Sequence, residues 1–120
     1  MKDLGKTSFG IPANIEGLLC YLFWGVSGLI ILIVDRKNTF VRFHAIQSVL
    51  FFGALALIVP LEIIVMPLTM HLGFLMPVFM MFNIVAGWLG LYCWIFLMVK
   101  AYQGDLFKLP ILGSVAEKLA

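Results

Sequence analysis

One segment of the sequence constrains this chain more than any other feature. Between Phe43 and Val99, about 57 residues carry a single formal charge, that of Glu62. Such a segment is too apolar to face water, and it is long enough for two bilayer crossings of about 20 residues each. A third apolar run, Gly17–Val34, precedes it and is separated from it by a charged segment that begins at Asp35. The sequence therefore predicts a small polytopic membrane protein.

The composition excludes several classes of protein. Hydrophobic residues make up 63% of the 120 residues and charged residues 12%, against roughly 45–50% and about 25% in soluble proteins. A soluble domain of this size buries only about 60–70% of the surface of its unfolded chain, so the solvent must be lipid. There is no room for a separate catalytic domain. The net charge of +2 is small and scattered, which argues against a nucleic acid partner.

We expect an all-α fold, a polytopic transmembrane helical bundle that forms a single membrane domain over residues 1–120. The apolar runs predict three membrane helices, at about residues 14–34, 39–66 and 75–99. Residues 100–120 form a tail that is expected to end in a short interfacial helix. Its apolar residues recur at roughly helical spacing: Ile111, Leu112, Val115 and Leu119.

Small residues and prolines add detail to these helices. Small side chains allow neighbouring helices to approach closely, and they occur in two groups: Gly25, Ser27 and Gly28, and Ala86, Gly87 and Gly90. The alternative for the first group is a break in the helix at Gly-Val-Ser-Gly. Pro60 is expected to kink the second helix, because proline removes a backbone hydrogen bond, and Pro67 is expected to begin the following turn.

Basic residues predict the orientation in the cell's inner (cytoplasmic) membrane. They occur in the first loop and in the tail but are absent from residues 67–74: Arg36, Lys37, Arg42, Lys100, Lys108 and Lys118. By the positive-inside rule, the first loop and the C-terminus of this multi-pass protein are cytoplasmic. Three crossings then place the N-terminus outside, together with the basic residues Lys2 and Lys6. In the alternative, the N-terminal run dips into the membrane and returns, which puts both ends inside.

A polar motif marks the start of the second predicted helix, Val-Arg-Phe-His-Ala-Ile-Gln-Ser at residues 41–48. On a helix, His44, Gln47 and Ser48 share one face, while Arg42 points away and can snorkel to phosphates. One interpretation is a site at the cytoplasmic end of the bundle, where His44 responds to pH or binds a partner. The other, which the spacing favours, is hydrogen bonding to other helices or to the C-terminal tail.

The remaining polar residues do not predict a catalytic, cofactor or metal site. Glu62 lies roughly 28 Å along the helix from Phe43 and is expected to anchor the helix at the far interface. Asn83 is expected to make a hydrogen bond between helices. The two cysteines and two histidines are too scattered for a metal site. We therefore expect a protein that is not an enzyme.

Two segments also carry a family resemblance. Residues 41–48, and the tail KAYQGDLFKLPILGSVAEK at 100–118, resemble small Tic-type membrane proteins, which are bacterial and archaeal relatives of the channel-associated subunit of the chloroplast import translocon. A family of magnetosome membrane proteins shares the Phe-His turn and the Leu-Pro-Ile tail. The chloroplast subunit is usually described with four membrane helices, against three predicted here. The resemblance marks seven positions: Arg42, Phe43, His44, Gln47, Ser48, Pro110 and Gly113.

Together these observations predict a non-catalytic assembly, scaffold or accessory subunit in protein translocation or membrane biogenesis. Its expected partners are the lipid bilayer and other membrane proteins or further copies of itself. The resemblance further implies that the tail around Pro110 docks against His44 and Gln47. The alternative function is a subunit of a homo-oligomeric pore or transporter.

Overall fold

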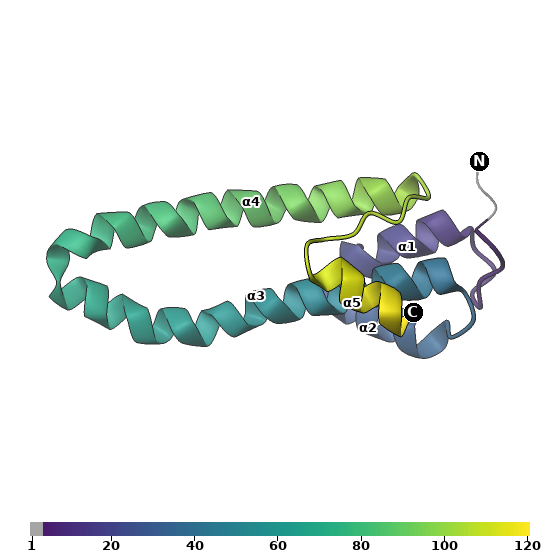
Figure 1. Cartoon of the computed structure of the whole chain (residues 1–120), viewed down its shortest axis with the longest axis horizontal. Coiled ribbons are helices and arrows are strands. Elements are labelled where there is room, and N and C mark those ends of the chain that lie inside the picture. Colours follow the sequence, from purple (N-terminus) through teal and green to yellow (C-terminus); the bar gives the residue numbers. More distant parts are fainter. Residues whose placement is uncertain (1–3) are drawn as a thin grey trace.

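The computed structural model describes residues 4–120, and every regular element in this part of the chain is helical. In chain order the elements are α1 (Ala13–Leu22), α2 (Trp24–Val34), α3 (Thr39–His71), the short 3-10 helix η1 (Gly73–Leu75), α4 (Met76–Tyr102) and α5 (Leu112–Leu119). The predicted all-α fold is confirmed. Figure 1 shows a long hairpin of α3 and α4 with the other helices gathered at one end.

The hairpin contains two helices that are long and apolar enough to cross a membrane. α3 has 33 residues and α4 has 27, which correspond to about 50 Å and about 40 Å of helix. Both extend beyond their predicted ends. α3 passes through Pro60 and Pro67 and ends at His71, where Pro67 was expected to begin the turn. Each proline removes one backbone hydrogen bond, a loss that membrane helices tolerate.

The predicted membrane helix at residues 14–34 is wrong as a continuous helix. The chain breaks at Phe23–Trp24, immediately before the Gly-Val-Ser-Gly segment, and Trp24 has a φ of 59°. The Ser27 hydroxyl accepts a hydrogen bond from the Phe23 N–H (3.2 Å) and lies 3.2 Å from the Cys20 carbonyl oxygen, to which it can donate. A nearby side chain therefore satisfies backbone groups that the break leaves without helical partners.

The two halves of this segment form a helical hairpin. With 10 and 11 residues, α1 and α2 are about 15–17 Å long, about half the thickness of the hydrocarbon core. The chain enters along α1 and returns along α2, so the loop at residues 35–38 lies at the same end as the beginning of α1 and the C-terminal tail (Figure 1). This geometry is the one that the alternative requires, in which the N-terminal run dips into the membrane and returns, and the placement of both ends on one side of the membrane stays a prediction.

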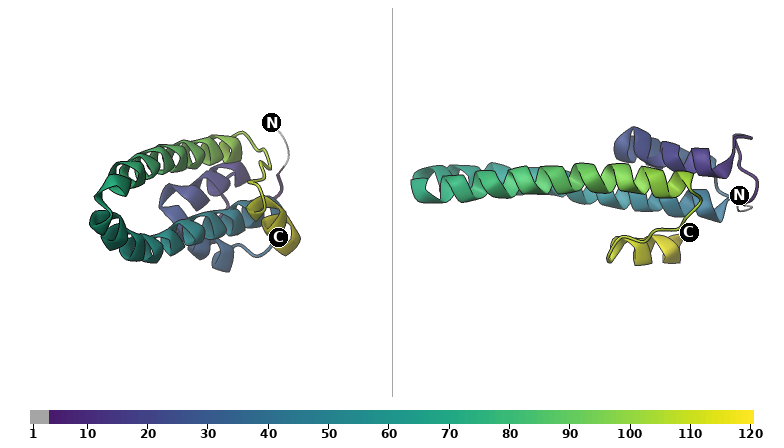
Figure 2. Two further views of the ribbon diagram at one scale, coloured as in Figure 1. Left: turned by 60° about the vertical axis from the view of Figure 1, so that its left-hand side comes forward. Right: turned by 90° about the horizontal axis from the view of Figure 1, so that it is seen from above.

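The molecule is divided along its length into two regions. In the packed end, residues 4–52 and 88–120, α1 contacts α3 and α4, and both α2 and α5 contact α3. Its buried core includes Cys20, Tyr21, Val41, Leu97 and Ala101. In the arm, residues 53–87, α3 and α4 extend beyond the other helices (Figure 2).

The two groups of small residues differ between these regions. A Cβ atom at Gly28 would lie 2.9 Å from Ser48 Oγ and 3.0 Å from the Cys20 carbonyl oxygen, so glycine is needed where the helices approach. Gly25 likewise lies close to α3, at Phe52. At Gly87 and Gly90 an added Cβ would meet open space. The first group packs as predicted, whereas the glycines of the second are not in close contact with another helix and line a cavity with Trp24 and Phe52.

Candidate functional site

The start of α3 is fixed by a polar side chain of the preceding loop. Asn38 is the N-cap, and its Oδ1 accepts a hydrogen bond from the Val41 N–H (3.0 Å). Its Nδ2 donates to the carbonyl oxygens of Leu4 (2.8 Å) and Lys6 (3.1 Å). A helix that begins with a side-chain cap has a defined first turn. Asn38 therefore sets both the register of the polar motif and its position relative to the N-terminal segment.

His44 lies at the centre of a buried hydrogen-bond network. Its Nδ1 is 2.9 Å from the Tyr21 hydroxyl of α1, and its Nε2 is 3.0 Å from the carbonyl oxygen of Asp105 in the tail. A carbonyl oxygen can only accept, so Nε2 carries the proton and Nδ1 accepts from Tyr21. The side chain of His44 is fully buried, and the rings of Phe40 and Phe43 contact it edge-on. The geometry therefore assigns a neutral imidazole with both nitrogens engaged.

Gln47 lies one turn further along the same face of α3 and completes the network. Its Nε2 donates to the Tyr21 hydroxyl (3.1 Å) and to the Phe107 carbonyl oxygen (2.9 Å). Its Oε1 accepts a hydrogen bond from the Leu109 N–H (3.0 Å). Both amide hydrogens and the oxygen are thus used. We call this set of groups the clasp: the side chains of Tyr21, His44 and Gln47 and the backbone of Asp105, Phe107 and Leu109.

The clasp holds the extended tail segment between α4 and α5 against α3. The predicted contact of the tail with His44 and Gln47 is confirmed, and it is made by the backbone of residues 105–109, just before Pro110. Backbone groups within an extended segment lack the partners that a helix would supply, and leaving them buried and unpaired is costly. The side chains of His44 and Gln47 therefore supply hydrogen bonds that a helix or strand would otherwise give to the tail backbone.

Ser48 shares the helix face of His44 but binds elsewhere. Its hydroxyl donates to the carbonyl oxygen of Cys20 (2.6 Å), at the point where α1 nears its end. The next carbonyl oxygen in this last turn of α1, that of Tyr21, accepts a hydrogen bond from Trp94 Nε1 of α4 (2.6 Å). Trp94 therefore lies in a contact between α4 and α1. Together these two bonds hold the break between α1 and α2.

Pro110 and Gly113 shape the turn that leads into α5. The Gly113 N–H donates to the Leu109 carbonyl oxygen (2.8 Å), and Ile111 adopts a φ of 68°. A Cβ at Gly113 would lie 2.5 Å from the Cα of Lys108, closer than real Cβ contacts allow. Only glycine fits without a backbone shift.

The predicted short C-terminal helix is present as α5, and it packs on α3. Ala116 is buried in a cluster with Phe43 and Ile46. Arg42 faces away from the clasp, as its position on the helix predicts, and its Nη2 lies 3.4 Å from the carbonyl oxygen of Leu119. Six of the seven marked positions thus position the tail or α5, or lie directly beside them, while Ser48 bonds to the end of α1.

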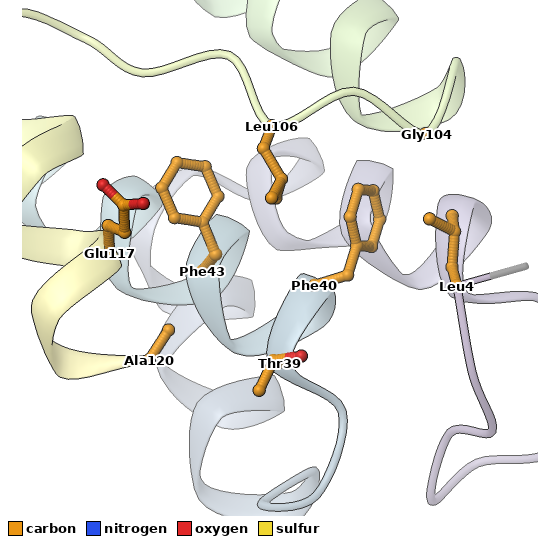
Figure 3. Close-up of a pocket in the computed structure, with 8 residues that line it drawn as sticks. All are labelled: Leu4, Thr39, Phe40, Phe43, Gly104, Leu106, Glu117 and Ala120. Atoms are coloured by element: carbon orange, nitrogen blue, oxygen red, sulfur yellow. The ribbon is translucent and has the colours of Figure 1, made fainter. Parts of the chain in front are cut away.

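A cavity of about 680 Å³ opens beside the clasp (Figure 3). Its walls come from the N-terminal segment, the start of α3, the tail and α5. Glu117 contributes a carboxylate, which is paired with Lys108 at 2.6 Å. The lining is otherwise mostly apolar: Leu4, Thr39, Phe40, Phe43, Gly104, Leu106, Glu117 and Ala120. Such a cavity is suited to binding an apolar group.

Two acidic residues missed by the sequence analysis are buried at the packed end, outside both long helices. Glu16, in the first turn of α1, has no hydrogen-bond partner for either carboxylate oxygen within the described residues. Burial raises its pKa to about 7, with a further rise from Asp35 against the opposing effect of the Thr7 hydroxyl. Burial also acts to raise the pKa of Asp35, but N–H donors of Ser8, Asn38 and Lys37 outweigh it and lower that pKa.

Potential metal ligands do not gather in the described part of the chain. No three histidine, cysteine, aspartate or glutamate side chains among residues 4–120 lie close enough together to hold a metal ion. Cys20 and Cys93 are free thiols. Glu16 and Asp35 contribute only two carboxylates, and two carboxylates alone do not complete a metal coordination shell.

The sequence matches the model of the magnetosome magnetite crystal formation protein family, MamF/MmsF, over residues 7–116. The chain belongs to this family. The match includes the clasp, the turn at Pro110 and most of α5, so the features that organise the packed end lie within the residues that the MamF/MmsF model matches. The predicted relation to magnetosome membrane proteins is thereby confirmed.

Curated relatives of this MamF/MmsF chain come from archaea. Two membrane proteins of Methanocaldococcus jannaschii, both named UPF0132, are 39% and 38% identical to it over 96% and 92% of the chain, covering 94% and 72% of their own lengths. A UPF0132 membrane protein of Archaeoglobus fulgidus is 39% identical over 83% of the chain and 93% of its own length. No solved structure matches the chain. The family and its archaeal relatives are membrane proteins, and the Tic-type resemblance stays a prediction.

Proposed function

We propose that this protein is a non-catalytic assembly or accessory subunit of the cell membrane, which binds other membrane proteins or further copies of itself. The observation that carries the proposal is the clasp. The polar motif that would be the best candidate for chemistry is used internally, to fix the tail and α5 on α3. The clasp thereby fixes the surface that the tail and α5 form at one end of the molecule.

The state of His44 supports a structural role over a catalytic one. A general base must present a free lone pair to its substrate. The Nδ1 lone pair of His44 accepts from Tyr21, and Nε2–H donates to the tail. A nucleophile activated by His44 would have to displace one of these buried bonds. The clasp therefore favours a protein whose function lies in binding.

The family name suggests the setting. It refers to magnetosome magnetite crystal formation, and the archaeal relatives are named only as membrane proteins. A part in membrane biogenesis fits both, and the Tic-type resemblance would make protein translocation its specific form. The basic residues near the packed end favour placing that end, with the first loop and the C-terminus, in the cytoplasm.

The experiment is purification in a mild detergent from native membranes, with mass spectrometry of the bound proteins and their copy number. The wild-type chain should retain a stoichiometric partner or a fixed number of its own copies. His44→Ala should lose that complex, because the tail is released. The matched control is Asn83→Leu, which removes a polar side chain whose hydrogen bond lies within α4.

Retention of the complex by His44→Ala would contradict the proposed role of the clasp. Recovery of the wild-type chain only as a monomer without partners would contradict the assembly function. Both results are read on the same samples, and circular dichroism establishes that each variant remains helical.

One observation favours the second candidate, a homo-oligomeric pore or transporter. At Gly87, at the end of the arm, and at Gly90 beside it, an added Cβ would meet nothing within 4 Å of the described chain, and small residues of this kind allow close contact between helices of different copies. Conductance measured on the purified protein in planar bilayers separates the two functions. A pore predicts ionic current that is altered by Gly87→Leu, whereas an assembly subunit gives none.

A further inference from the structure

A second groove lies on the side of the packed end opposite the clasp. It has a volume of about 400 Å³ and is lined by Leu32 of α2, by Leu119 of α5 and by four residues of α3: Arg42, Ile46, Val49 and Leu50. These four occur at i, i+4, i+7 and i+8, so they form one stripe along the helix. The stripe is about 12 Å long. The groove is therefore an apolar channel along α3 with a single cation at one end.

That cation has little to neutralise it. Among the described residues no carboxylate pairs with Arg42, and its guanidinium makes one long hydrogen bond, 3.4 Å to the Leu119 carbonyl oxygen. The acidic groups of the tail are committed elsewhere, since Asp105 pairs with Lys100 and Glu117 with Lys108. Arginine presents five N–H donors, so most of those of Arg42 are available to a ligand.

We propose that this groove binds an anionic membrane phospholipid, with its phosphate on the Arg42 guanidinium and an acyl chain along Ile46, Val49 and Leu50. The planar guanidinium fork matches two phosphate oxygens. Basic pockets between helices at the cytoplasmic side of a membrane are a known form of headgroup recognition.

The combination of charge and apolar wall selects the lipid among other ligands. A free phosphate ion would use Arg42 and leave the apolar stripe uncovered. An extended peptide would place backbone N–H and C=O groups against Ile46 and Leu50, where no polar side chain of the groove lining satisfies them. A phospholipid satisfies both parts of the groove. Leu119 is 58% exposed, so a ligand reaches the groove from the surrounding membrane.

The test uses the full chain, purified in a mild detergent and titrated separately with phosphatidylglycerol and phosphatidylcholine, with bound lipid counted by native mass spectrometry. The wild-type protein should bind phosphatidylglycerol at least tenfold more tightly than phosphatidylcholine. Arg42→Gln should lose about tenfold in affinity for phosphatidylglycerol, which corresponds to one strong charge-assisted contact. The matched control is Lys37→Gln, which removes the same charge from an exposed loop residue that does not line the groove.

A second variant tests the apolar part of the site while leaving the charge intact. Leu119→Trp places a larger side chain in the groove and should also reduce phosphatidylglycerol binding about tenfold. Equal binding of the two lipids by the wild type would overturn the proposal, as would an affinity for phosphatidylglycerol that neither Arg42→Gln nor Leu119→Trp changes. A loss in Lys37→Gln equal to that in Arg42→Gln would show attraction to surface charge in place of a site.

Discussion

The packed end and the arm use polar side chains in different ways. In the packed end, side chains of Asn38, His44, Gln47 and Ser48 make hydrogen bonds to residues far away in the sequence. In the arm, the hydrogen bonds described for side chains span at most seven residues: from Thr69 to Met66, from Thr69 to the Met76 sulfur and from Asn83 to Phe79. A helix in lipid satisfies its own backbone and gains little hydrophobic driving force from a neighbour. Polar side chains therefore specify the tertiary structure in the packed end, where the short helices and the tail need hydrogen-bond partners.

The largest expected effect that tests this comparison is that of Gln47→Leu. It leaves the partly buried Phe107 carbonyl and Leu109 N–H without their side-chain partner, and an unsatisfied buried group costs about 1–3 kcal/mol. We expect the free energy of unfolding to fall by about 3 kcal/mol, measured by denaturant titration in detergent micelles. Asn83→Leu in the arm should change it by less than about 1 kcal/mol. Equal effects of the two changes would abolish the distinction between the regions.

The next effect concerns two glycines in helices. At Gly28 an added Cβ would lie within 3.0 Å of both Ser48 and the Cys20 backbone, whereas at Gly87 it would meet open space. Gly28→Ala should therefore cost about 1–3 kcal/mol through overpacking. Gly87→Ala should be neutral or slightly stabilising, because alanine favours helix by up to about 1 kcal/mol. Thermal unfolding of both variants in the same detergent makes the comparison, and a stable Gly28→Ala would contradict close packing of α2 on α3.

A smaller effect is expected in the pH dependence of the packed end. The pKa of Glu16 rises from its ordinary 4.5 to about 7 on folding, mainly through burial, so the folded state binds more protons between these values. Its stabilising contribution is complete below about pH 4.5 and is lost as the pH rises to about 7. Glu16→Gln should flatten this decline in thermal stability. An unchanged slope in the variant would mean that Glu16 does not titrate in this range.

The smallest effect is expected on the surface of the arm. Ile64 is 71% exposed, so Ile64→Ala should change the free energy of unfolding by less than about 0.5 kcal/mol. Leu97 in the packed end is fully buried, so the same truncation there opens a cavity and should cost clearly more than at Ile64. A large cost at Ile64 would indicate that a second copy of the chain covers the arm, and the oligomeric state of Ile64→Ala would then decide it.

Much of the fold follows from the sequence, because the solvent dictates it. Between Phe43 and Val99 only Glu62 is charged. In lipid, such a segment satisfies its backbone hydrogen bonds by forming helices, and α3 and α4 are found there. The face shared by His44 and Gln47 follows from helical spacing. The prediction that the tail is their partner rests on the family resemblance and on the need of buried polar groups for hydrogen bonds.

The break at Phe23–Trp24 could not be located from the sequence in the same way. Residues 17–34 are uniformly apolar, and a continuous helix satisfies the backbone of such a run as well as a broken one does. What decides between them is tertiary: Ser48 and Trp94, both distant in the sequence, bond to carbonyl groups just before the break. Tyr21 was missed for the same reason, since its hydroxyl gains a role only when α1 lies against α3.

The break also has a consequence for how the protein enters the bilayer. α1 and α2 run away from the beginning of the packed end and back to it, and the connection at the far end of the arm, residues 72–75, carries no charge. Moving charged groups across lipid is the expensive step of insertion. A chain built in this way can be inserted as one hairpin from a single side, with Glu62 as the one charge that must travel deep into the membrane.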